Sequence, residues 1–171
     1  MVDATLVRKM AHAYFGNGVV SRHWDHGWLK SAWGAYLECC WEEDQKGPEA
    51  LDSFLWGKAE QYFNECESYQ RPLVTNEYNN SRQLLDCHVY QGGAWRLHML
   101  RRGMGDVLFW QGVANYLTKY DQKVVETEDF RKELEAVSGM NLTCFFDEWI
   151  YGRGYPELKV SLNQPNLVPG S

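Results

Sequence analysis

Apolar residues recur at helical spacing along almost the whole chain, and this period limits the fold more than any other feature of the sequence. A first stripe at i, i+3, i+4 and i+7, typical of the buried face of one helix, consists of Val7, Met10, Ala11 and Tyr14. Six more stretches show such spacing: residues 29–40, 48–63, 89–102, 109–120, 127–137 and 142–150. Only Leu158–Leu162 alternates as a strand does. The pattern predicts an all-α fold of about seven helices, packed as an orthogonal or bundle-like domain with a short extended C-terminal tail.

Residues that begin or end helices separate these stretches. Pro48 suits the first turn of a helix, and Gly139 suits the position just after one. Thr127 is expected to be an N-cap, because Glu128 and Asp129 place negative charge at the positive end of the helix dipole. No heptad repeat accompanies these signals, so the helices are expected to pack as one domain rather than as a coiled coil.

The length of 171 residues fits a single domain. We assign residues 1–162 to this domain and residues 163–171 to a tail. Leu167–Ser171 resembles a thrombin-cleavage linker without its arginine, so part of the tail is expected to come from cloning.

Charge and composition exclude several classes of protein. The net charge is −6, and apart from Arg101 and Arg102 the chain concentrates no cations, which excludes a nucleic-acid partner. No stretch approaches the ~18 apolar residues of a membrane span, and no signal peptide is evident. The five cysteines are odd in number and form no C-x-x-C motif, which favours a reduced setting. We therefore expect a soluble protein, cytoplasmic or recombinant, with no membrane partner.

The histidines other than His12 give weak signals. His23 and His26 are three residues apart, a spacing that can offer a metal pair, but a role at a helix start or on the surface is favoured. His88 and His98 stand apart from any carboxylate or thiol pattern, so both are expected to be ordinary packed or surface residues.

Three segments resemble the zinc aminopeptidases of the aminopeptidase N and leukotriene hydrolase type, the gluzincins. Residues 10–38, MAHAYFGNGVVSRHWDHGWLKSAWGAYLE, are similar to the H-E-x-x-H-x-W-F-G-N…W-x-D-x-W-L-N-E-G-x-A-x-Y stretch of that family. Residues 90–117 resemble its Y-x-K-G segment and the helices that follow, and residues 127–161 resemble the segment that closes its catalytic domain. The resemblance covers residues 4–162 and implies the helical half of a thermolysin-like catalytic domain.

The family's metal site is degenerate in this sequence. In H-E-x-x-H the two histidines bind zinc and the glutamate acts as general base, and a second glutamate nineteen positions after the second histidine is the third ligand. Here Arg8 and Lys9 replace the first histidine and the base, Ser31 replaces the third ligand, and only His12 remains.

Three further positions belong to the same comparison. Lys30 stands where the family has an asparagine, and Gly92 stands where it has the lysine of Y-x-K-G. Tyr90 is kept, and the resemblance implies that the matching tyrosine stabilises the oxyanion of the reaction. His12 and Tyr90 are therefore the remnants of a catalytic site.

One histidine flanked by cations supplies neither the coordination nor the negative charge that zinc needs, so we predict no metal, no cofactor and no catalytic residue. The cations either fill the space of the zinc and its carboxylates or simply keep an exposed face in water. The favoured function is an inactive, metal-free derivative, natural or engineered, that serves as a protein-binding or scaffold domain. The alternative is a zinc aminopeptidase-type hydrolase with residual activity.

The predicted interface follows from the altered positions. It consists of Arg8, Lys9, Lys30, Ser31, Tyr90 and Gly92. A protein partner or a second copy of the chain is expected to bind there or on the face where the family's helical half packs against its other half. The partner's identity and the oligomeric state stay open.

Overall fold

The computed structural model describes residues 4–156 together with 159 and 161. Its helices are α1 (Ala4–Tyr14), α2 (Trp28–Lys46), α3 (Pro48–Cys66), α4 (Gly93–Met104), α5 (Asp106–Lys119), α6 (Thr127–Ser138) and α7 (Thr143–Trp149). Three short helical turns add η1 (Trp24–His26), η2 (Ser81–Leu84) and η3 (His88–Gly92). The prediction of an all-α fold with seven helices is confirmed for this part of the chain. The strand-like pattern at Leu158–Leu162 and the tail from residue 163 fall mostly or wholly outside the described residues.

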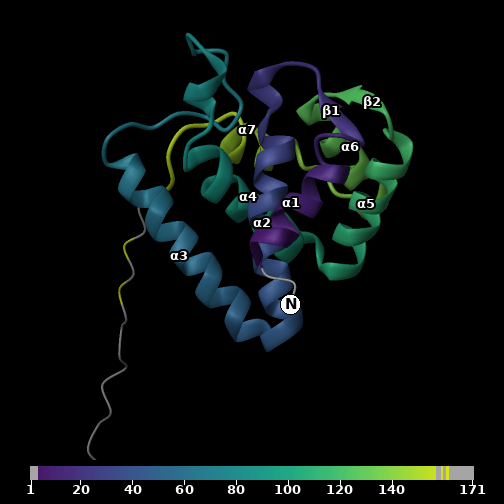
Figure 1. Cartoon of the computed structure of the whole chain (residues 1–171), viewed down its shortest axis with the longest axis horizontal. Helices are drawn as coiled ribbons and strands as arrows, with labels where there is room; N and C mark the ends of the chain where they lie inside the picture. The colour runs from purple at the N-terminus through teal and green to yellow at the C-terminus, as the bar shows by residue number, and fades with distance from the viewer. Residues whose placement is uncertain (1–3, 157–158, 160, 162–171) are drawn as a thin grey trace, which may run out of the picture.

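Helix α2 is the centre of the domain. Helices α1, α3 and α4 all contact it, and Figure 1 shows α1 lying across it. Its side chains Trp28, Trp33 and Tyr36 are fully buried. Trp33 stacks on Phe15 with ring centroids 4.3 Å apart and meets Phe130 of α6 edge-on at 5.9 Å. The aromatic richness of the sequence therefore builds a core around one helix, which holds the N-terminal and C-terminal segments together.

Small residues let the helices close on one another. A Cβ added to Gly93 would lie 2.5 Å from the Cβ of Ala32, and one added to Gly112 would lie 2.8 Å from a methyl carbon of Leu134. Glycine is therefore required where α4 meets α2 and where α5 meets α6.

Two features of the fold were not predicted. Strands β1 (Val19–Ser21) and β2 (Lys123–Val125) form a two-stranded parallel sheet, with Val20 opposite Val124. Three residues are too few to show alternation, and the partners lie about a hundred residues apart in the chain. The helix predicted from residue 89 instead begins as the π-helical turn η3, in which the Gly92 amide donates to the Cys87 carbonyl at 2.8 Å, and continues as α4.

The N-cap of α6 was predicted one residue too late. It is Glu126, whose backbone amide donates to Asp129 Oδ2 at 2.8 Å. Thr127 is the first helical residue and is fully buried. Its hydroxyl accepts a hydrogen bond from Trp28 Nε1 at 2.9 Å and contacts His26 Nδ1 at 2.9 Å. The hydroxyl thus ties α6 to η1 and α2 instead of capping its own helix.

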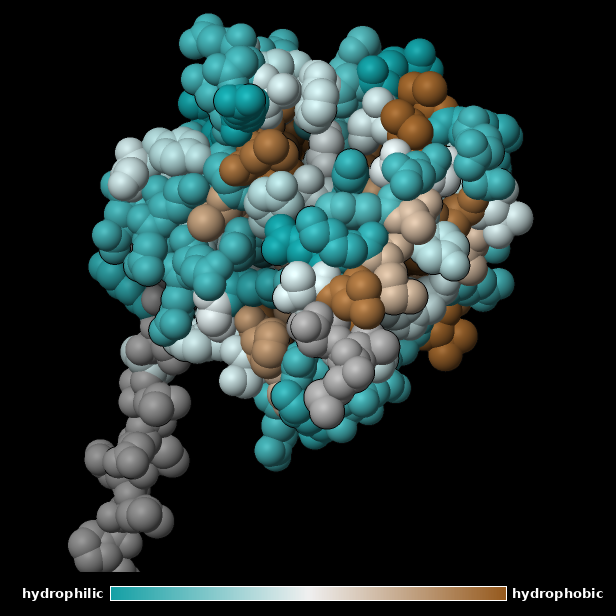
Figure 2. Space-filling view, viewed as in Figure 1, coloured by the Kyte–Doolittle hydropathy of each residue, from teal (hydrophilic) through white to brown (hydrophobic). Residues whose placement is uncertain are grey.

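Figure 2 shows the same face as Figure 1, with polar residues over most of it and apolar residues in separate patches. Exposed apolar side chains include Met10 and Tyr14 of α1, the paired Val20 and Val124, and Trp24. Among the described residues, no helix is long and apolar enough to cross a membrane.

Candidate functional site between helices α1 and α2

Helix α1 turns Arg8 and His12, one turn apart, toward the same point on α2. A Cβ added to Gly34 would lie 3.0 Å from His12 Nε2 and 3.1 Å from Arg8 Cγ. Ser31 lies one turn before Gly34 on α2 and lines the same cleft as His12. The fold therefore brings residues 8, 12 and 31 together, as the spacing along the sequence suggests.

Arg8 is held by two partners inside the domain. Its guanidinium lies 3.7 Å from a Glu38 carboxylate oxygen and stacks over the Tyr90 ring, 4.7 Å from the centroid. The other oxygen of Glu38 accepts from Lys58 Nζ at 3.1 Å. The Glu38 carboxylate is thus already paired with two cations, and one of them, Arg8, also covers the ring of Tyr90.

His12 lies in a positive and partly buried environment. Burial, followed by the charges of Lys30, Arg8 and Lys9, lowers the pKa of its imidazole. Its Nε2 atom is buried and has no hydrogen-bond partner among the described residues. The ring is therefore neutral at pH 7, and one of its nitrogens is unsatisfied.

A cleft of about 470 Å³ opens beside His12. His12, Lys30, Ser31 and Tyr90 all line it, together with the aromatic side chains of Trp24 and Trp28. The four-carbon stem of Lys30 packs on Gly16, where an added Cβ would come within 2.8 Å of Lys30 Cδ. Gly16 also has a φ of +146°, a backbone conformation that favours glycine, so glycine there serves both the turn and the lysine.

The six predicted interface positions differ in their exposure. Lys9 and Lys30 are exposed, whereas Arg8 and Tyr90 are half-buried. Ser31 is buried at 7% exposure. Gly92 is buried against the Tyr62 ring and the Arg96 guanidinium and is not part of the cleft wall. Gly92 therefore offers no surface to a partner, and Ser31 offers little.

Sequence and structure comparisons agree on the family. The model of the peptidase family M1 domain matches residues 1–149. The chain belongs to peptidase family M1. Aminopeptidase M1-D of Oryza sativa subsp. japonica is 28% identical over 176 residues, which cover 94% of this chain and 19% of the relative. Glutamyl aminopeptidase of Bitis rhinoceros is 28% identical over 166 residues, or 95% of this chain and 17% of the relative. The chain thus spans about a fifth of the length of such relatives.

Solved structures share the fold. Yeast LTA4 hydrolase in complex with bestatin has a TM-score of 0.80 at 20% identity and covers 93% of this chain and 27% of its own. The M1 zinc metallopeptidase of Deinococcus radiodurans has a TM-score of 0.72 at 24% identity, over 92% of this chain and 34% of its own. The helical arrangement of this chain is therefore that of a segment of the M1 peptidases.

The M1 family implies a zinc ion beside His12, and the residues present do not fit one. Zinc sites use nitrogen, sulfur or carboxylate ligands, whereas the positions that converge on His12 supply a guanidinium and a serine hydroxyl. Glu38 is neutralised by Arg8 and Lys58. The positive charges of Lys30 and Lys9, which also act on His12, would repel a dication. We therefore assign no chemistry at this site to a metal.

The other histidines lie in different environments. His23 is exposed, and His26 joins η1 to α6 through Thr127. His98 Nδ1 lies 3.2 Å from the Tyr36 hydroxyl, and burial followed by the charges of Arg101 and Arg102 lowers its pKa. These two half-buried histidines serve packing, in keeping with their weak sequence signals.

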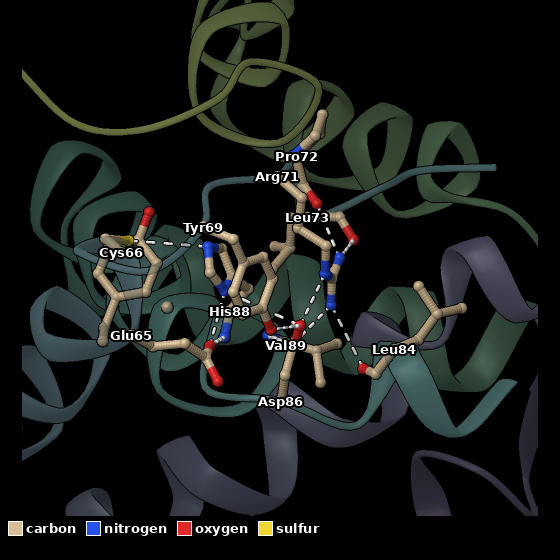
Figure 3. A network of polar contacts seen from close by, with 12 residues as sticks. Glu65, Cys66, Tyr69, Arg71, Pro72, Leu73, Leu84, Asp86, His88 and Val89 are labelled. Carbon is tan, nitrogen blue, oxygen red and sulfur yellow. Dashed lines mark hydrogen bonds and ion pairs between the residues drawn. The ribbon is translucent and has the colours of Figure 1, made fainter. Parts of the chain in front are cut away.

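His88 is packed, as predicted, but the fold gives it carboxylate and thiol neighbours that the sequence pattern did not indicate. Its Nδ1 atom lies 2.7 Å from Glu65 Oε2, and its Nε2 atom lies 3.7 Å from Cys66 Sγ, as Figure 3 shows. The ring is buried at 2% exposure and stacks against Tyr69. Glu65 and Cys66 end α3, more than twenty residues before His88, so no local pattern in the sequence could have shown the contact.

This cluster resembles a metal site only in composition. Glu65, Asp86 and His88 offer ligand atoms within 4.8 Å of one another. However, Asp86 Oδ1 already accepts from Arg71 and the Val89 amide, at 2.7 and 3.0 Å. Its Oδ2 accepts from Arg71 and the Tyr69 hydroxyl, at 2.8 and 2.6 Å. Asp86 thus has a cation and a full set of donors, and the cluster stabilises the loop that carries part of the cleft wall.

Proposed function

We propose that this chain is a non-catalytic segment of an M1 peptidase domain that holds no zinc and serves as a protein-binding or scaffold module. The observation that carries the proposal is the environment of His12, where Arg8, Lys9 and Lys30 supply positive charge and Ser31 supplies a hydroxyl. This chemistry is the reverse of what a dication requires.

The loss of the metal and the loss of the base support one another. Peptide hydrolysis on this scaffold needs a water made acidic by a metal and a carboxylate to take its proton. The general-base position holds Lys9, an exposed cationic side chain in place of a carboxylate. Tyr90 contacts the guanidinium of Arg8. Two of the three metal ligands and the general base are therefore replaced, and Tyr90, which remains, contacts a cation.

The surface around His12 can still bind a partner. The cleft beside His12 has a volume of about 470 Å³, which is the size of a typical ligand pocket. The exposed Lys30 lines this cleft together with Trp24 and Trp28, and aromatic side chains are enriched in recognition surfaces. A protein partner, or a second copy of the chain, is the proposed occupant of this face.

The alternative, an aminopeptidase-type hydrolase with residual activity, rests on one observation: His12, Ser31 and Tyr90 line one cleft. The relatives are named as aminopeptidases, and the alternative extends that activity to this chain. Against it, His12 Nε2 has no hydrogen-bond partner among the described residues, so no hydroxyl is activated by the imidazole. The alternative therefore lacks a nucleophile and base pair.

An arylamide assay separates the two functions. We expect the chain to cleave leucine p-nitroanilide at the background rate, with or without added zinc sulfate. Zinc-dependent turnover that a chelator abolishes would overturn the proposal. A restored variant, Arg8→His, Lys9→Glu and Ser31→Glu, tests whether the site regains function. A matched control changes the same residue types at exposed positions, Arg102→His, Lys132→Glu and Ser53→Glu.

A further inference from the structure

The charged side chains that line the cleft differ in whether they have a partner. Both arginines are paired with carboxylates: Arg22 pairs with Glu126 at 2.7 Å, and Arg71 pairs with Asp86 at 2.7 Å. The Lys30 ammonium has no ion-pair or hydrogen-bond partner among the described residues. The lining carboxylate of Asp25 accepts one hydrogen bond from the His26 amide at 3.0 Å and forms no ion pair with Lys30. The cleft therefore presents one unpaired ammonium.

Lys30 is also held in place. Its stem packs on Gly16 so closely that an added Cβ would come within 2.8 and 2.9 Å of Lys30 Cδ and Cε. This contact limits the rotamers of a side chain that is otherwise flexible, so less entropy is lost when the ammonium binds an anion. The lysine is thus partly preorganised at the cleft.

The rest of the lining suits an apolar body. Aromatic and aliphatic side chains make up most of it: Val20, Trp24, Trp28, Leu73, Leu85 and Val89. Trp24 and Leu85 are 61% and 51% exposed, so the mouth of the cleft is open to solvent. Ser31 and Tyr90 add hydroxyl groups that can donate hydrogen bonds to an anion.

We propose that this cleft binds a carboxylate carried on an apolar body, with the Lys30 ammonium as counter-ion and the Ser31 and Tyr90 hydroxyls as hydrogen-bond donors. The inference rests on the proposed function, because a zinc ion at His12 would replace this arrangement. The chemistry is shared by a free aryl or alkyl acid and by the C-terminal residue of a polypeptide.

Isothermal titration calorimetry on the full chain tests the proposal with 3-phenylpropanoate and 3-phenylpropanamide. We expect the acid to bind at least about tenfold more tightly than the amide, the usual effect of a hydrogen-bonded charge. Lys30→Met keeps the stem and removes the charge, so it should weaken the acid about tenfold and leave the amide unchanged. Lys132→Met, at an exposed lysine of α6 outside the cleft wall, is the matched control and should change neither.

A second pair of probes identifies the source of the carboxylate. N-acetyl-Ala-Ala-Phe with a free carboxyl group is compared with its C-terminal amide. A preference for the free carboxylate in either pair supports the inference, and the tighter acid shows whether a small molecule or a chain terminus is the better ligand. Equal binding of acid and amide in both pairs, no binding of any acid, or an unaffected Lys30→Met variant overturns it. Zinc analysis of the same sample separates the two failures, since bound zinc refutes the proposed function and a zinc-free chain without acid preference refutes this inference alone.

Discussion

Asp86→Ala tests whether the buried network of Figure 3 stabilises the domain. The side chains of Arg71 and Asp86 are 12% and 9% exposed, and the carboxylate accepts four hydrogen bonds. Removing one partner of a buried pair leaves the other charge uncompensated, which costs about 3–5 kcal/mol. We expect the free energy of unfolding to fall by that amount in urea titrations followed by tryptophan fluorescence, with an unchanged denaturant slope.

An exposed pair of the same type is the control. Arg153 and Glu77 are 2.8 Å apart, as close as the buried pair, but their side chains are 55% and 70% exposed. Glu77→Ala should therefore reduce stability by about 0–1 kcal/mol. Asp86→Asn, which keeps the shape and loses the charge, should fall between the two alanine variants. If Asp86→Ala and Glu77→Ala have equal unfolding free energies, burial does not set the strength of this pair and the reasoning fails.

Three further outcomes follow from the same contacts. Burial would raise the pKa of Asp86, but hydrogen bonds from Arg71 and Tyr69 outweigh it and hold the pKa below 3.8. The stability that this ionised carboxylate gives is present above pH 3.8 and is lost as the pH falls through the folded pKa. The urea midpoint of Asp86→Asn should therefore fall less on acidification than that of the unaltered chain. Gly112→Ala should destabilise the domain by about 1–3 kcal/mol in the same titrations, because its Cβ would press on α6. Lys30→Met should raise the pKa of His12 in an NMR titration, since burial and then Lys30 are the largest causes that lower it.

Much of the helical fold could be predicted because its signal is local. The stripe from Val7 to Tyr14 and the six later stretches each carry their own period, and all seven became helices. Features that depend on distant partners were not predictable in this way. Thr127 was predicted as an N-cap from its neighbours in the sequence, but its hydroxyl contacts Trp28 and His26 instead. Segments β1 and β2 form strands because they pair with each other.

The site shows the same division. Helical geometry puts Arg8 and His12 on one face, and the family spacing puts Ser31 opposite them, so sequence alone identified the positions. Contacts between distant residues were not predicted. The pairing of Arg8 with Glu38 joins two helices, and the contact of His88 with Glu65 joins residues 23 apart. Gly92 was assigned to the interface from its altered identity, which says nothing about its burial.

Zinc stoichiometry is the most direct test of the account. The chain is equilibrated with zinc sulfate, passed through a desalting column and analysed by mass spectrometry for metal per chain, beside the variant Arg8→His, Lys9→Glu and Ser31→Glu. The environment of His12 predicts that the unaltered chain keeps no zinc and that the restored variant keeps it. One zinc per unaltered chain, lost on His12→Ala, would contradict the claim that cations and a hydroxyl have replaced the metal site.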